Sequence, residues 1–118
     1  MNKKELKDRT KQFAIRVVKL ISRLPSSIEG QAIARQLIRS GTSVGANYRA
    51  ACRGRSKAEF AAKLGIVEEE ADESAFWMEI IIETGLLKKG LVEALLKEAN
   101  ELVAIMAASR KTMKKTAR

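Results

Sequence analysis

The stretch that decides the fold is residues 56–82, SKAEFAAKLGIVEEEADESAFWMEIII. Ser56 and Glu59 have the spacing of a capping box, in which two side chains satisfy free backbone N–H groups at the start of a helix. Apolar side chains then recur every three, four or seven residues, which is the repeat of one helix face. The members of this seam are Phe60, Leu64, Val67, Ala71, Ala75, Met78 and Ile82. We therefore expect a long amphipathic helix, which the lysine pair at 88–89 closes and Gly90 follows.

The same signals predict two helices before this one and one after it. Asn2 with Glu5, and Ser26 with Glu29, repeat the capping box ahead of new helical patterns. The apolar positions are Leu6, Phe13, Val17, Leu20 and Leu24 in the first helix, Ile33, Leu37, Val44, Tyr48 and Ala51 in the second, and Leu91, Leu95, Ala99, Leu102 and Ile105 in the last. We expect the last helix to fray into a basic tail over residues 110–118.

Four amphipathic helices with short connections predict a single all-α domain over residues 1–118, an antiparallel up-and-down four-helix bundle. One proline and seven glycines leave few turns for a β-sandwich or barrel. Gly41 and Gly45 lie inside the second helix, where each costs about 1 kcal/mol relative to alanine. We expect another helix to pack closely against the backbone at these two positions.

The composition excludes several classes of site. The chain has no histidine, so Ser-His-Asp and Cys-His nucleophiles, His-ligated zinc and the Glu-x-x-His di-iron signature are impossible. Cys52 is the only cysteine, which excludes an intrachain disulfide, fits a cytoplasmic protein and predicts a half-buried helical side chain. The most apolar window, residues 75–87, is shorter than the roughly 20 residues of a membrane span. We expect a non-enzymatic protein without catalytic residues, metal, cofactor or membrane partner.

A row of arginines lies along the second predicted helix of this basic chain, whose formal net charge is +9. At about 100° per residue, four arginines fall within about 40° of one direction, over roughly 27 Å of helix, and two more cations follow. We call these six residues the basic ridge: Arg35, Arg39, Arg49, Arg53, Arg55 and Lys57. Guanidinium groups stay charged and hold phosphate oxygens in pairs, so the basic ridge predicts a nucleic-acid-binding surface. The alternative is a solvated helix face.

The third helix differs from the others in charge and in apolar surface. Residues 58–88 carry eight acidic and two basic side chains, spread around the helix rather than gathered in one carboxylate site. We interpret these acids as partners of a basic surface on a neighbouring helix or subunit. Six apolar residues lie off the predicted core seams: Ile15, Val18, Phe76, Trp77, Ile80 and Ile81. One core cannot bury them all, so we predict a homo-oligomer interface at these residues, anchored by Trp77.

The central sequence also carries a family resemblance. Residues 36–51, QLIRSGTSVGANYRAA, with KLGIVEEEADE at 63–73 and the Phe76–Trp77 pair, resemble the bacterial four-helix-bundle proteins encoded in intervening sequences of large-subunit ribosomal RNA genes. More distantly the chain is similar to the accessory variability proteins of diversity-generating retroelements. The resemblance implies a non-enzymatic basic pentamer that associates with RNA or a nucleoprotein. Ala50 lies at a position where many relatives have glutamate. The polar residues that match the family are expected to form hydrogen bonds between helices: Ser40, Ser43 and Asn47.

Three functions follow for testing. The first is a homo-oligomeric adaptor that holds structured RNA by its phosphates. The second is a protein-interaction scaffold that docks an acidic partner protein, such as a reverse transcriptase, without a direct nucleic-acid role. The third and least favoured is a carboxylate-dependent enzyme that uses Glu69 or Glu73.

Overall fold

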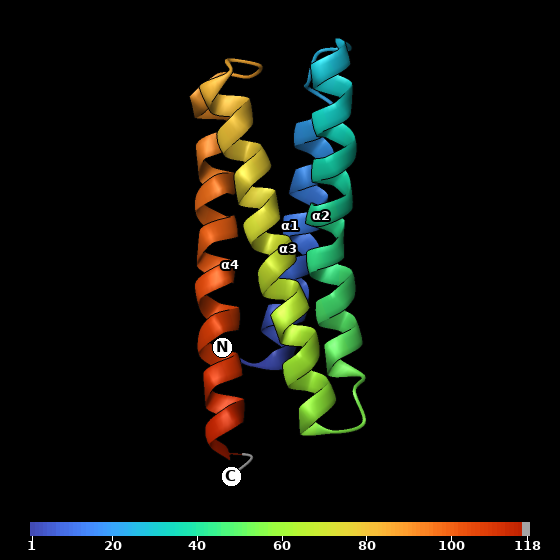
Figure 1. Ribbon diagram of the computed structural model, residues 1–118, viewed down its shortest axis with the longest axis vertical. Helices are drawn as coiled ribbons and strands as arrows, with labels where there is room; N and C mark the ends of the chain where they lie inside the picture. Colours follow the sequence, from blue (N-terminus) through green and yellow to red (C-terminus); the bar gives the residue numbers. More distant parts are fainter. Residues whose placement is uncertain (117–118) are drawn as a thin grey trace.

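Each of the first three helices begins where a polar side chain caps free backbone N–H groups. The computed structural model describes residues 1–116, which form four helices: α1 (Lys3–Ile21), α2 (Ile28–Cys52), α3 (Lys57–Glu83) and α4 (Lys89–Thr116) (Figure 1). Asn2 Oδ1 accepts the Glu5 N–H at 2.8 Å. Ser56 Oγ accepts the Glu59 N–H at 3.1 Å. Both predicted caps are confirmed.

Two helix boundaries differ from the predicted ones. Ser27, rather than Ser26, caps α2, and its Oγ accepts the N–H three residues later at 3.1 Å. Adjacent serines have the same capping chemistry, so only the path of the backbone selects between them. The α3 helix ends at Glu83 rather than at 88–89, because Gly85 adopts a left-handed conformation with φ of 71° that terminates the helix.

The four helices run alternately up and down in a bundle that measures 50 × 20 × 19 Å (Figure 1). The two chain ends and the α2–α3 turn lie at one end of the bundle, and the α1–α2 and α3–α4 turns lie at the other. The predicted fold class is confirmed. The predicted fraying is wrong within the described residues, since α4 continues as a helix through Thr116; the last part of the predicted tail, residues 117–118, lies outside them.

The core lies along the seams predicted for α1 and α2, and α3 contains the main correction. Ile81, which was predicted at an oligomer interface, is fully buried in the core of the single subunit. The seam reaches Met78 through Ala71 and Ser74, and a further step of three residues places Ile81 rather than Ile82 on the buried face.

The buried face of α4 is also shifted by one residue at each end. Val92 and Met106 are fully buried, whereas Leu91 is 44% exposed and Ile105 is half-buried. The observed steps of three and four residues from Val92 keep these side chains on one face, as they do in α3.

Close packing between α1 and α2 explains both glycines inside α2. A Cβ atom on Gly41 would lie 2.7 Å from both methyl carbons of Val17. A Cβ atom on Gly45 would lie 3.1 Å from the carbonyl oxygen of Thr10. The predicted close helix packing is therefore confirmed, and it brings α1 directly against the α2 backbone at these two positions.

Two features are absent from the described residues. Within residues 1–116, no helix combines the length and apolarity needed to cross a membrane. In the same residues, no group of three or more Cys, Asp or Glu side chains is arranged to hold a metal ion.

Candidate nucleic-acid interface

The basic ridge is only partly a free surface. Arg35, Arg49 and Arg53 have exposed side chains that form no ion pair or hydrogen bond with any other residue between 1 and 116. The opposite face of α2, which includes Leu37 and Val44, is buried in the core. The amphipathicity of α2 therefore turns these three guanidinium groups outward, as the sequence predicted.

Arg39 departs from the predicted row because α3 neutralises it. Its Nη1 donates to Glu70 Oε2 at 2.9 Å, and its Nη2 donates to Glu73. The hydrogen bond from Arg39 to Glu73, together with the charge of Glu70, raises the pKa of Arg39 above its ordinary value. The acids of α3 thus offset part of the basic ridge, as we interpreted them, and Arg39 has fewer donors left for a phosphate than its neighbours.

The α2–α3 turn extends the free part of the basic ridge to the end of the bundle. Arg53 is the C-cap of α2, where its positive charge interacts favourably with the negative end of the helix dipole. Arg55 and Lys57 have exposed side chains, and the backbone N–H of Arg55 donates to Glu59 Oε2 at 2.7 Å. The capping box therefore stabilises the turn that presents Arg55 and Lys57.

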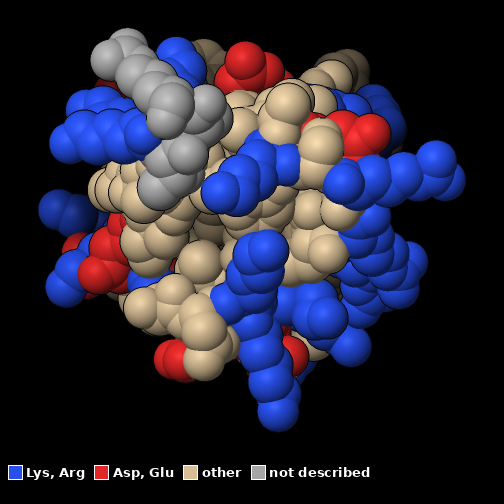
Figure 2. Space-filling model, turned by 90° about the horizontal axis from the view of Figure 1, so that it is seen from below, with Lys and Arg blue, Asp and Glu red and all other residues tan. Residues whose placement is uncertain are grey.

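The structure adds cations that the sequence reasoning missed. The antiparallel topology brings the start of α1, the end of α2 and the end of α4 to the same end of the bundle, and Figure 2 shows Lys and Arg side chains dominating this end. We call the exposed cations there the basic end: Lys3, Lys4, Lys7, Arg49, Arg53, Arg55, Lys57, Lys111, Lys114 and Lys115. Glu5, Asp8 and Glu59 are the acids in the same segments. Basic segments at both chain ends were visible in the sequence, but their meeting required the fold.

Two hollows lie among these cations. A groove of about 250 Å³ between α1 and α2 is lined by Lys7, Lys11 and Arg49, so α1 widens the basic ridge. A recess of about 490 Å³ at the basic end contains Phe60, and Lys3 Nζ lies 4.5 Å from the centre of the Phe60 ring. Both hollows combine cations with apolar walls.

Cys52 forms part of the wall of this recess. It is a free, half-buried thiol packed against the core, as predicted. Burial raises the pKa of the neighbouring Tyr48 phenol, and Cys52 adds to that shift. Tyr48 is consequently uncharged at neutral pH, and the charge of the recess comes from its lysines and arginines.

The predicted oligomer-interface residues divide into three groups. Ile15, Val18 and Phe76 are exposed, and the fold does not bring the α1 pair and the α3 residues into one surface of a single subunit. Trp77 and Ile80 are half-buried against the core, and Ile81 belongs to it. Phe76 is therefore the exposed aromatic side chain of α3.

The ring of Phe76 meets Trp77 edge-on, with 5.1 Å between ring centres. The indole of Trp77, predicted as the interface anchor, donates instead to Glu73 at 3.2 Å within its own helix. Half-burial and this hydrogen bond hold Trp77 in place within the subunit.

The polar positions of α2 have two roles. Ser40 Oγ lies 2.9 Å from Ser74 Oγ, and both side chains are buried, so this pair links α2 to α3 as expected. Asn47 instead donates to the carbonyl oxygen of Ser43 at 2.9 Å, within α2. For Asn47 the expected hydrogen bond between helices is therefore wrong.

Comparison with known proteins places this bundle in a family. The family model described as 23S rRNA-intervening sequence protein matches residues 2–108. The chain belongs to this family. This 23S rRNA-intervening sequence protein matches no curated protein significantly. It is 33% identical to a solved structure, described as a protein of unknown function from the S23 ribosomal protein family of Bacteroides thetaiotaomicron VPI-5482, with a TM-score of 0.84 over 90% of this chain and 98% of the other.

Proposed function

We propose that this protein is a non-enzymatic RNA-binding adaptor that acts as a homo-oligomer and holds structured RNA by its phosphates. The observation that carries the proposal is the basic end, where exposed cations from α1, α2, the α2–α3 turn and α4 outnumber the acids of the same segments. Phosphate contacts of this kind give affinity without reading base sequence. Shape and charge, rather than base identity, then select the ligand.

The arrangement of cations supports an RNA with two or more strands or a folded single strand. Arg35, Arg49 and Arg53 continue from the basic end along α2, so the cationic surface covers one end and one side of the bundle. A row of cationic side chains that follows α2 for several turns can contact several successive phosphates of one strand. Self-association would place several basic ends together, and the pentamer implied by the more distant resemblance would form a ring of them.

The test is a salt titration of binding to a structured RNA, measured by fluorescence anisotropy. If about six phosphates are neutralised, log affinity falls against log salt with a slope of magnitude about 4 to 5. The variant R49Q/R53Q lowers this slope by about 1.4 to 1.8, because each lost contact removes about 0.7 for a single strand and about 0.9 for a duplex. The charge-matched control K88Q/K89Q, which alters exposed lysines at the other end of the bundle, leaves the slope unchanged.

Two results would overturn the proposal. If the two variants lower the slope equally, RNA binding depends only on the net charge of the protein. If the protein binds no RNA at low salt, the second hypothesis, an acidic protein partner, takes the place of this proposal. Arg39→Gln supplies an internal check: its guanidinium is already held by Glu70 and Glu73, so this change should lower the slope less than Arg49→Gln does.

A further inference from the structure

The contact between α1 and α4 contains ion pairs near the basic end but, within residues 1–116, none near the other end. Near the basic end, Arg9 joins the two helices through two hydrogen bonds to Glu98, at 2.7 and 2.6 Å, and Glu101 lies 3.5 Å away. Toward the other end, Arg16 of α1 and Arg23 of the turn after it face α4, and neither side chain forms an ion pair or hydrogen bond among the described residues. This half of the described α1–α4 contact therefore holds cations without ion pairs, although the charge of Glu98 also acts on Arg16.

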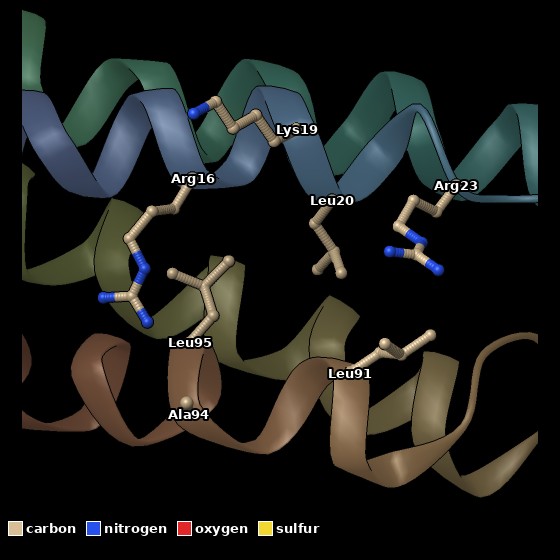
Figure 3. Close-up of a pocket in the computed structure, with 7 residues that line it drawn as sticks. All are labelled: Arg16, Lys19, Leu20, Arg23, Leu91, Ala94 and Leu95. Atoms are coloured by element: carbon tan, nitrogen blue, oxygen red, sulfur yellow. The ribbon is translucent and has the colours of Figure 1, made fainter.

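These cations border a hollow of about 240 Å³ that we call the α1–α4 groove, lined by Arg16, Lys19, Leu20, Arg23, Leu91, Ala94 and Leu95. Figure 3 shows Arg16 of α1 and Arg23 of the following turn projecting toward α4 on either side of Leu20, with Leu91 and Leu95 on the α4 side of the groove. Leu91 is 44% exposed, although it belongs to a helix that packs against α3. An apolar floor between two guanidinium groups that form no ion pair within the described residues is complementary to an occupant with one apolar side chain between two acids.

The α3 helix carries a surface of that composition on its outward face. Glu68, Glu70 and Glu73 are held by arginines of the neighbouring helices α2 and α4. The acids between them point away from the core and form no ion pair or hydrogen bond within residues 1–116. With an exposed aromatic side chain they form what we call the acidic stripe: Glu69, Asp72, Phe76, Glu79 and Glu83.

The two surfaces have the same spacing. Arg16 and Leu20 are four residues apart in α1, and Arg23 follows in the turn, where its backbone N–H donates to Leu20 O at 3.0 Å. Asp72, Phe76 and Glu79 occupy positions i, i+4 and i+7 of α3. The two sets therefore have the same sequence spacing, and in α3 the acids are about 10.5 Å apart with Phe76 between them on the same face. Parallel helices in this register would pair each arginine with an acid.

We propose that a second copy of this chain docks its α3 acidic stripe into the α1–α4 groove, with Phe76 seated on Leu20, Leu91 and Leu95. Asp72 then faces Arg16, and Glu79 faces Arg23. The α1 and α3 helices run in the same direction, and both surfaces lie toward the end with the α1–α2 and α3–α4 turns, so neighbouring bundles stand parallel at one level. The basic end stays free.

The groove and the stripe are different surfaces of one subunit, so the contact is head-to-tail. Repetition of such a contact closes into a ring when the rotation between subunits allows it, and otherwise forms a filament. The inference rests only on the homo-oligomer part of the proposed function and not on RNA binding.

The experiment measures mass by light scattering for the full chain and for two charge-reversed variants, R16E/R23E and D72K/E79K. The wild type is expected to be an oligomer, and each variant alone is expected to fall to the 13.0 kDa subunit, because like charges then meet across the contact. Mixing the two variants restores assembly, since each now offers the complement of the other. A matched control, D8K/E29K, changes the charge by the same amount as D72K/E79K at two exposed acids that neither line the groove nor belong to the stripe, and keeps the wild-type mass.

Far-ultraviolet circular dichroism verifies that both variants remain helical, and the mixture separates a broken contact from a broken fold. A monomeric wild type, or variants that stay oligomeric, would overturn the inference. A mixture that remains monomeric would overturn the pairing of groove and stripe. An oligomer that binds no RNA would contradict only the RNA-binding part of the proposed function. A monomer that binds RNA would contradict the assembly in both proposals and leave RNA binding standing.

Discussion

Replacing Gly41 by alanine tests the packing between α1 and α2. The added Cβ would lie 2.7 Å from both Val17 methyl carbons and 2.9 Å from the Val17 Cβ, about 1 Å closer than carbon atoms pack in protein interiors. Val17 is fully buried and β-branched, so it cannot turn aside, and overpacking of this kind costs about 1 to 3 kcal/mol. Alanine recovers about 1 kcal/mol of helix propensity. We expect Gly41→Ala to lower the free energy of unfolding by about 1 kcal/mol net.

A control and a coupled variant isolate the steric cause. A Cβ on Gly65, inside α3, would lie 3.7 Å from Arg110 Cδ, an ordinary contact. Gly65→Ala should therefore raise stability by up to about 1 kcal/mol through propensity alone. Val17→Ala costs about 2 kcal/mol by itself, but it removes the methyl groups that obstruct a side chain at Gly41. In that background the remaining Cβ of residue 17 still lies 2.9 Å from the new methyl group, so Gly41→Ala should cost less than it does in the wild type, and the two changes should be non-additive.

The assay is urea unfolding followed by far-ultraviolet circular dichroism, at one protein concentration because self-association adds to apparent stability. The reasoning is refuted if Gly41→Ala and Val17→Ala are additive, or if Gly41→Ala and Gly65→Ala change stability in the same direction. Either result would mean that α1 yields to the new methyl group without cost.

Three further substitutions test contacts elsewhere. Glu98→Gln should cost about 1 to 3 kcal/mol at neutral pH, since the hydrogen bonds from Arg9 lower the pKa of Glu98. A carboxyl whose pKa is lower in the folded state stabilises the protein above its unfolded pKa of about 4.3, so the difference from wild type should disappear in acid denaturation as the pH falls through the folded value. Ser74→Ala should cost about 1 kcal/mol by leaving the buried Ser40 with its weaker bond, whereas the double change to alanine should cost less than the sum of the two single changes in urea unfolding. Gly85→Ala, at φ of 71°, should lower the melting temperature by an amount equivalent to about 1 kcal/mol.

Periodicity predicted the elements and most of the core, and it was wrong where two choices had equal local chemistry. Ile81 and Ile82 both continue the α3 seam from Met78, by three or by four residues, and only the position of the neighbouring helices selects Ile81. Ser26 and Ser27 are equivalent caps in the same sense. Such pairs differ by about 100° around a helix, and that difference has an energy only once a partner surface is present.

The candidate site shows the same division. The outward direction of Arg35, Arg49 and Arg53 could be predicted, because it depends on the apolar face of their own helix. The neutralisation of Arg39 could not be assigned, because it depends on Glu70 and Glu73 being within reach across the α2–α3 contact. The number of ridge cations counted in the sequence is therefore larger than the number that are free of ion pairs on the described surface.

The sequence by itself determined the four amphipathic helices, the two tight glycine positions of α2 and the excess of positive charge, since each of these is a property of residues within a few turns of one another. Only the tertiary structure decided which charges are cancelled, which cations meet at the basic end, and which half of the described α1–α4 contact has no ion pair. Those features join residues far apart in the chain, and Coulomb and packing energies depend on distances in space that local periodicity does not contain.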